Sequence, residues 1–169
     1  AASGGVTTVI DMPTTSPPTI TPESFRAKKK IAQKKALVDF ALHAGVTPLT
    51  IDHIPELVKE GATSFKMFIA EKVRQFGNMN KEALYNALKK IGEFKALASF
   101  HAESELVPFL KKKLQDAGRM DIVAHLDSRP IQAESEAIFQ ILQLAKETKA
   151  FVHICHMSSA EGAKLVQEA

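Results

Sequence analysis

A single lysine interrupts a short apolar run of the sequence. Lys66 lies within residues 64–70, SFKMFIA, which have the length and composition of a buried strand. Alternation along a strand places Lys66 on the same face as Ser64 and Phe68. Two interpretations are open. Lys66 is an edge-strand lysine that extends to water, or it has a catalytic or chemically modified amine. Burial lowers a lysine pKa, and a neutral amine can react with carbon dioxide to give a carbamate, an anionic metal ligand.

Two histidines end two later apolar runs. His101 follows Phe100 in FHAE, and His156 lies within HICHMSS, residues 153–159. A neutral imidazole at the carboxyl end of a strand is a good ligand for a divalent metal ion. Either histidine alone is typical of a structural residue. With a lysine buried in the preceding strand, the two together predict a metal cluster of Lys66, His101 and His156.

The other histidines are weaker candidates for metal binding or catalysis. His153 is three residues before His156, so strand alternation predicts that the two face opposite sides and that His153 packs beneath the site or against a helix. We expect a structural or supporting role for His43 at the end of a strand. We expect His53 to be an inert loop residue and His125 to order a loop.

Short apolar runs alternate with amphipathic stretches along the whole chain. Strands are predicted over residues 6–12, 37–43, 64–70, 96–102 and 150–157, and helices over 22–35, 54–60, 81–93, 104–117, 132–149 and 159–169. Thr21 is a candidate N-cap before Pro22, and Gly61 a candidate helix stop. Repeated β-then-α units predict a parallel sheet with right-handed crossovers. The sheet is either an open doubly wound sheet or part of a (β/α)₈ barrel, which typically needs about 250 residues.

Composition narrows the function classes. The 169 residues are 45 % hydrophobic and 24 % charged, as in an ordinary globular domain. No apolar run approaches the length of a membrane span, and the single cysteine predicts no internal disulfide. The net charge is +3, but the basic residues concentrate on two predicted helix faces and aromatic residues are few. We therefore expect no membrane and no nucleic-acid partner, and a cytoplasmic location.

Several motifs resemble the cyclic amidohydrolases, the metal-dependent group that includes dihydroorotase, hydantoinase and allantoinase. The motifs occur in that family's order: AASGGVTTVIDMP with TTSPPT, GATSFKMFIA, FHAE, the run Ser128-Arg129-Pro130 with Glu134, Glu136 and Ala137, and HICHMSS. The resemblance covers nearly all of residues 1–169. It implies one partial domain, roughly the second to sixth units of a TIM-type (β/α)₈ barrel.

The resemblance also implies roles for individual residues. Lys66 would be a carboxylated lysine that bridges two divalent metal ions, most often zinc, and His101 and His156 would bind one of them. A metal-activated hydroxide would attack the ring amide carbonyl of a small cyclic amide or ureide. Thr14 stands where dihydroorotases usually have an asparagine that binds substrate. We also expect a homo-oligomer.

Some parts of the family pattern are expected outside the sequence. These are a His-x-His pair on the first barrel strand, an aspartate on the last strand and a small β-sandwich. The chain opens on Ala1 without an initiator methionine, which suggests a start inside a fold. We therefore expect these 169 residues alone to be inactive and, without the missing ligands, Lys66 to be unmodified.

The subfamily is open at this level. The pattern DMPTTSPPT favours dihydroorotase, while Glu71 replaces the tyrosine that hydantoinases usually have after the bridging lysine. The helix after FHAE is closer to hydantoinases, and HICHMSS also fits allantoinases. Two other classes remain. One is a non-catalytic assembly partner with the same fold, and the other is an open-sheet binding domain, for which a glycine-rich phosphate loop is missing.

Overall fold

The computed structural model describes residues 1–70 and 76–169, and five strands run through them. The strands are β1 (Thr8–Asp11), β2 (Asp39–Gly45), β3 (Ser64–Phe68), β4 (Leu97–His101) and β5 (Phe151–Ile154). All neighbouring strands pair in parallel, in the order β1-β2-β3-β4-β5. The predicted parallel sheet is therefore confirmed.

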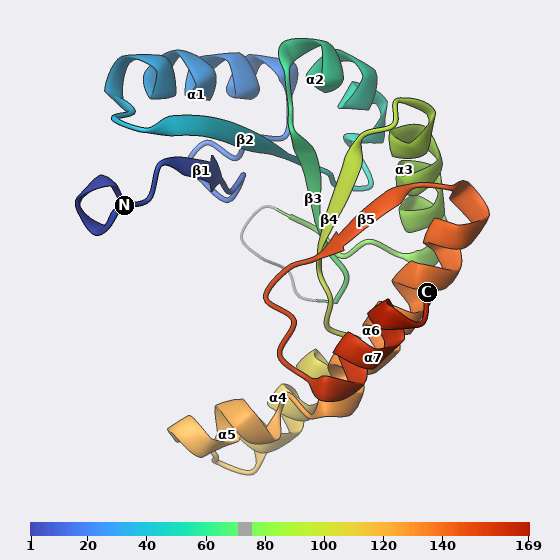
Figure 1. Ribbon diagram of the computed structural model, residues 1–169. Coiled ribbons are helices and arrows are strands. Elements are labelled where there is room, and N and C mark those ends of the chain that lie inside the picture. The colour runs from blue at the N-terminus through green and yellow to red at the C-terminus, as the bar shows by residue number, and fades with distance from the viewer. Residues whose placement is uncertain (71–75) are drawn as a thin grey trace.

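Helices follow the strands in the chain. They are α1 (Pro22–Lys35), α2 (Ile54–Glu60), α3 (Lys81–Glu93), α4 (Leu106–Asp116), α5 (Ile122–Asp127), α6 (Ile131–Thr148) and α7 (Ala160–Gln167), with two short 3₁₀ helices at Ala2–Gly4 and Ile51–His53. Figure 1 shows α1, α2, α3 and α6 along one side of the curved sheet, with α4 and α5 extending beyond the sheet at one end. Within the described part of the chain, no helix has the length and hydropathy needed to cross a membrane.

The strand order distinguishes the two sheet architectures that the sequence left open. A doubly wound sheet reverses its strand order at a switch point and carries helices on both faces. Here each strand is added next to the preceding one, and the helices lie on one side (Figure 1). A sheet built in this way is an arc of a (β/α)₈ barrel.

Alternation along the strands separates a packing face from an inner face. On the packing face, Phe65 and Met67 of β3 and Phe100 of β4 are fully buried in the hydrophobic core with the apolar stripes of α3 and α6. Fully burying each such side chain contributes about 1.5–3 kcal/mol. On the inner face, the register pairs Lys66 with Ser99. Site residues and core residues therefore come from the same strands but point in opposite directions.

Thr21 begins α1 as the sequence predicted. Its side-chain oxygen accepts a hydrogen bond from Ser24 N at 3.3 Å, and Ser24 Oγ accepts one from Thr21 N at 3.1 Å. This reciprocal pair is a capping box, which satisfies two donors at the helix start. Pro22 occupies the first turn, where its missing N–H costs nothing.

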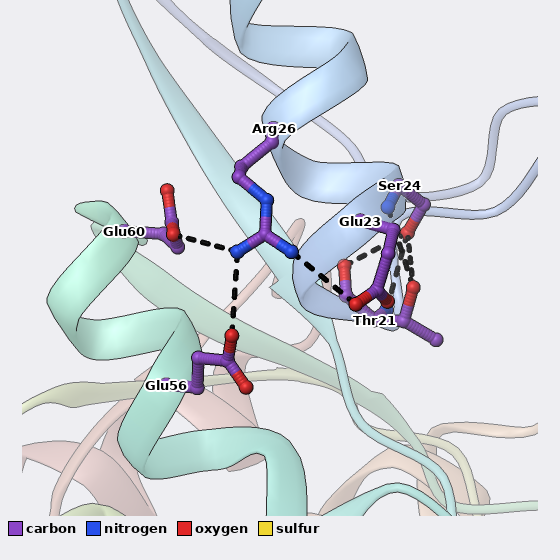
Figure 2. A network of polar contacts seen from close by, with 6 residues as sticks. All are labelled: Thr21, Glu23, Ser24, Arg26, Glu56 and Glu60. Atoms are coloured by element: carbon purple, nitrogen blue, oxygen red, sulfur yellow. Dashed lines mark hydrogen bonds and ion pairs between the residues drawn. The ribbon is translucent and has the colours of Figure 1, made fainter.

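Arg26 joins α1 to α2 (Figure 2). Its guanidinium contacts Glu23 at 3.2 Å, Glu56 at 3.3 Å and Glu60 at 2.8 Å. Because these side chains are partly or well exposed, water screens the attraction and the network adds little stability. Its effect is to set the position of two neighbouring helices.

Two sequence predictions need correction. The fifth strand was predicted to continue to Met157 but ends at Ile154, and His156 lies in a turn with a left-handed backbone, φ 39°. His125 was expected in a loop but lies in α5. This helix escapes a periodicity search because it has six residues and buries only Ala124. Its start is fixed by Asp121, which accepts a hydrogen bond from Ala124 N at 3.0 Å.

Candidate metal centre

Lys66 is buried in the middle of the sheet. Strand β3 pairs with β2 on one side and β4 on the other, and only 2 % of Lys66 is exposed. The interpretation of Lys66 as an edge-strand lysine that reaches water is therefore wrong. Among the described residues, its Nζ has no hydrogen-bonding partner. Burial lowers the pKa of Lys66, and the nearby Cys155 thiol only partly opposes that shift.

His101 and His156 are in direct contact. His101 Nδ1 and His156 Nε2 lie 2.9 Å apart, and the ring centroids are 4.7 Å apart. Two imidazole nitrogens bound to one tetrahedral zinc ion at about 2.0–2.1 Å would be separated by roughly 3.3 Å. The observed separation is thus close to that of two ligands of one ion. His156 has a left-handed backbone, φ 39°, and its ring contacts the last residue of β4.

Glu103 determines how the His101 ring is held. Its Oε2 lies 3.1 Å from His101 Nε2, and its Oε1 lies 3.4 Å from Arg129 Nε. A carboxylate accepts hydrogen bonds, so in the neutral ring the proton lies on Nε2 and the lone pair of Nδ1 faces His156. The hydrogen bond from His101 is the main reason that the pKa of Glu103 is lowered, with Arg129 adding to the effect.

Phe68 lies between the buried amine and the histidine pair. Lys66 Nζ is 5.2 Å from the centroid of the Phe68 ring, and that ring is 5.7 Å from the ring of His101. Burial lowers the pKa of His156, and the charges of His101 and Lys66 lower it further. Lys66, His101 and His156 therefore lie near one another at the carboxyl edge of the sheet.

The described residues hold no ready-made cluster of three or more histidine, cysteine or acidic side chains around one point. The pair of imidazoles and the buried amine are the components present. An amine is not itself an anionic ligand, so Lys66 could join such a cluster only after conversion to a carbamate.

Glu134 of α6 secures the turn that follows β5. Its carboxylate accepts hydrogen bonds from Ser158 N at 2.9 Å, Ser158 Oγ at 3.0 Å and Ser159 N at 2.8 Å, and a further one from Ser159 Oγ. Burial tends to raise the pKa of Glu134, but these hydrogen bonds outweigh it and the pKa is lowered.

A buried polar row lies deeper on the inner face. His43 Nδ1 is hydrogen-bonded to Ser64 Oγ, and Ser99 Oγ donates to Ser64 Oγ at 3.3 Å. Burial lowers the pKa of His43, and the charge of Lys66 lowers it further. The predicted supporting role of His43 matches this position, although β2 continues two residues beyond it.

His153 lies on this inner face as well. The register pairs it with Ser99, which pairs in turn with Lys66. Its position on the inner face is compatible with packing beneath the site, which stays a prediction. Strand alternation does not predict on which side His156 lies relative to His153, because β5 ends at Ile154, between the two residues.

Three further residues that the sequence singled out, Thr14, His53 and His125, have described positions. Thr14 follows β1, at the same carboxyl edge but at the far end of the strand order, and its substrate-binding role remains a prediction. His53 ends a short 3₁₀ helix. His125 Nδ1 lies 3.2 Å from Arg129 Nη1. Glu71 falls outside the described residues.

Sequence reasoning assigned no role to Glu103, Arg129 or Glu134. All three belong to the motifs FHAE and SRP-x(3)-E-x-EA, so the signal was present in the order of the motifs. Their partners lie on other elements, however, and only the fold brings them together.

Paired imidazoles and a buried amine at the carboxyl edge of a barrel sheet define an α/β-barrel protein with a candidate metal centre. No protein-family model matches the chain. Among curated proteins, it is similar to an L-hydantoinase of Paenarthrobacter aurescens (36 % identity, 100 % of this chain and 37 % of the relative). It is similarly close to a dihydroorotase of Methanosarcina acetivorans (37 % identity, 99 % and 36 %) and an allantoinase of Bacillus velezensis (34 %, 99 % and 38 %).

Solved structures agree. The L-hydantoinase from Arthrobacter aurescens superposes with a TM-score of 0.93 at 35 % identity, covering 98 % of this chain and 37 % of that one. A D-hydantoinase superposes with a TM-score of 0.87 at 28 % identity, covering 99 % and 37 %. In sequence and in fold, the chain is related over its whole length to the cyclic amidohydrolases. It spans between 36 % and 38 % of the length of these three curated relatives.

Proposed function

We propose that the protein containing this chain is a metal-dependent hydrolase that opens the ring of a cyclic amide or ureide. The observation that carries the proposal is the buried amine of Lys66, which has no hydrogen-bonding partner among the described residues, near the contact between His101 and His156. A buried polar group without a partner costs about 1–3 kcal/mol, and more if it is charged. Buried ionisable groups with strongly perturbed pKa values cluster at functional sites, which makes Lys66 a candidate for chemistry.

The chain's side chains fit a metal centre. His101 and His156 would hold one divalent ion, and Lys66 would bridge to a second ion as a carbamate. Burial favours the neutral amine of Lys66. That amine can add to carbon dioxide with loss of a proton, which turns a destabilising donor into an anionic oxygen ligand. When bound, divalent ions, zinc by preference, lower the pKa of a water molecule and polarise a carbonyl group.

The remaining residues of the site orient these groups. Glu103, backed by Arg129, holds the His101 proton on Nε2 and leaves Nδ1 available. The aromatic ring of Phe68 packs beside the amine, and the ring of Phe76 packs against Phe68 with the two centroids 5.3 Å apart. By the family resemblance, further ligands come from parts of the barrel outside these residues.

The substrate class follows from the relatives. Proteins similar to this chain are named L-hydantoinase, allantoinase and dihydroorotase, and their identities to it differ little. These names share one reaction, the hydrolysis of a ring amide. Dihydroorotate is the first candidate because of the pattern DMPTTSPPT around Thr14. Allantoin and hydantoin are the next substrates to compare.

The test is a ring-opening assay on the purified protein that contains this chain, in the presence of zinc and bicarbonate. We expect hydrolysis of at least one of the three substrates, loss of that activity in Lys66→Ala, and retention in Lys59→Ala, since Lys59 is exposed on α2. A protein that binds no zinc and opens none of these rings would instead be a non-catalytic assembly partner with the same fold.

A further inference from the structure

The start of α6 contacts both loops that carry the histidine pair. After β4, Ser104 N donates to Ala133 O at 2.9 Å, and Ser104 Oγ donates to Glu136 at 2.9 Å. After β5, Ser158 and Ser159 donate to Glu134. The first two turns of α6 are therefore a shared anchor for the segments that hold His101 and His156.

Glu134 accepts more hydrogen bonds than the other residues at the start of α6 that contact these loops. Both of its oxygens are used: Oε1 accepts the N–H and hydroxyl of Ser158, and Oε2 accepts the N–H and hydroxyl of Ser159. Only a carboxylate offers acceptor capacity on both atoms, because an amide has one oxygen and one donor nitrogen. Hydrogen bonds to a charged acceptor are also stronger than neutral ones.

The packing around this carboxylate is close. A Cβ atom on Gly162 would lie 2.7 Å from Ile138 Cδ1, 2.8 Å from Ser159 Oγ and 3.3 Å from Glu134 Oε2. A side chain at this position would therefore require Ile138, Ser159 or Glu134 to move. Ser159 itself caps α7 by accepting a hydrogen bond from Gly162 N at 3.0 Å. Glu134, Ser159 and the start of α7 thus form one rigid unit.

This unit lies directly after His156. His156 has a left-handed backbone, φ 39°, a conformation that non-glycine residues keep only when the surrounding structure holds it. Ser158 and Ser159, two and three residues later, are fixed to α6 by Glu134. From this turn, His156 Nε2 contacts His101 Nδ1 at 2.9 Å.

We propose that Glu134 is a positioning residue for the metal centre, which holds the His156 imidazole against His101 through the turn at Ser158 and Ser159. The inference rests on the proposed function in taking His156 as a metal ligand. Glu134 contacts neither the imidazole nor the expected ion, so its effect is on the orientation of a ligand rather than on the chemistry itself.

The test measures Zn²⁺ affinity by competition with a chromophoric chelator, using the purified protein. We expect Glu134→Gln to weaken Zn²⁺ binding about 10–100-fold, the usual effect of removing a group that orients a ligand. Glu161→Gln is the matched control, because Glu161 is also an acidic residue, in the first turn of α7. It removes the same charge without touching Ser158 or Ser159, and its Zn²⁺ affinity is expected to stay within twofold of wild type.

A second readout is independent of both metal and activity. In the metal-free protein, Glu134→Gln is expected to shift the NMR signals of the His156 ring and to speed amide exchange at Ser158 and Ser159, whereas Glu161→Gln is not. Unchanged Zn²⁺ affinity and unchanged His156 signals in a folded Glu134→Gln protein would overturn the proposal. If Glu134→Gln does not fold, Ser158→Ala replaces it as the test, because this variant removes one exposed hydroxyl that donates to Glu134. Weaker Zn²⁺ binding in Ser158→Ala would support the positioning role of Glu134. Zn²⁺ binding as tight as in wild type would contradict it.

These results separate the inference from the proposed function. A protein that opens none of the rings but loses Zn²⁺ affinity in Glu134→Gln would retain the positioning role and reject the hydrolase. A protein that opens a ring but binds Zn²⁺ equally well with Glu134→Gln would retain the hydrolase and reject the positioning role.

Discussion

His101 Nδ1 and His156 Nε2 lie 2.9 Å apart although 55 residues separate them in the sequence. The contact joins the end of β4 to the turn after β5, and each ring is supported from outside the pair. Glu103 holds the first ring, and Glu134 holds the turn that carries the second. The following predictions test the groups around this contact.

Replacing Lys66 by methionine is expected to stabilise the fold. Methionine has a similar length and removes a buried amine that has no partner among the described residues, so the free energy of unfolding should rise by about 1–3 kcal/mol. Chemical denaturation of metal-free, bicarbonate-free protein, followed by circular dichroism, measures the change. Lys59→Met, at an exposed site on α2, should stay within about 0.5 kcal/mol of wild type. A less stable Lys66→Met protein would show that the amine has a partner in solution.

The advantage of Lys66→Met over wild type should shrink at alkaline pH. The pKa of Lys66 is lowered in the folded state, so between that lowered value and the unfolded pKa of about 10.4 the unfolded chain binds more protons. Wild-type stability therefore rises with pH across this window and falls as pH drops through it. Unfolding free energies of both proteins, compared from neutral pH upward, should converge. A constant difference would contradict a lowered pKa.

His43 is expected to make the fold sensitive to mild acid. Burial lowers its pKa in the folded state, so its stabilising contribution is present above the unfolded pKa of about 6.5 and is lost as pH falls through the lowered value. His43→Gln does not titrate, so its difference in unfolding free energy from wild type should change with pH only below about 6.5. A difference that is flat from pH 7 to pH 4 would count against this.

Glu103→Ala is expected to weaken Zn²⁺ binding about 10–100-fold, because the His101 ring loses the acceptor that fixes its proton on Nε2. Glu105→Ala is the control, since Glu105 is exposed and contacts Asn78 rather than a histidine. Equal Zn²⁺ affinities in the two variants would show that His101 needs no partner to keep its orientation.

Gly45→Ala is expected to destabilise the fold by about 1–3 kcal/mol, the cost of overpacking a filled core. A Cβ atom on Gly45 would lie 2.1 Å from the Phe76 ring, which is itself buried and packs against Phe68. Denaturation measures the loss. Wild-type stability in Gly45→Ala would mean that Phe76 can leave its position freely.

Much of the architecture was predictable because the apolar periodicity and the helix-end residues of each segment agree with the way that segment packs in the fold. The helix predicted over residues 81–93 has those bounds in the structure, since Leu84, Leu88 and Ile91 form a stripe that the core buries. Gly61 ends α2 in a left-handed conformation, as predicted. In contrast, α5 is short and mostly exposed, and hydropathy does not reveal it.

The candidate site was predictable in its members but not in its geometry. Lys66, His101 and His156 are conspicuous as polar residues at the ends of apolar runs. Two things could not be read from spacing: the left-handed turn at His156 and the contacts from Arg129 and Glu134 to distant loops. These depend on how α6 and the segment before it lie against the sheet. The periodicity of residues within one helix or strand does not predict how that element packs against another.

The two faces of the strands have a consequence for the diversity of this family. On β3, Phe65 and Met67 point toward the helices, and the lysine between them points to the opposite side. Substitutions that reshape the reaction chamber can therefore accumulate on one set of alternating positions without disturbing the set that keeps the scaffold folded. Such a separation allows the inner face to vary at little risk to the stability of the fold.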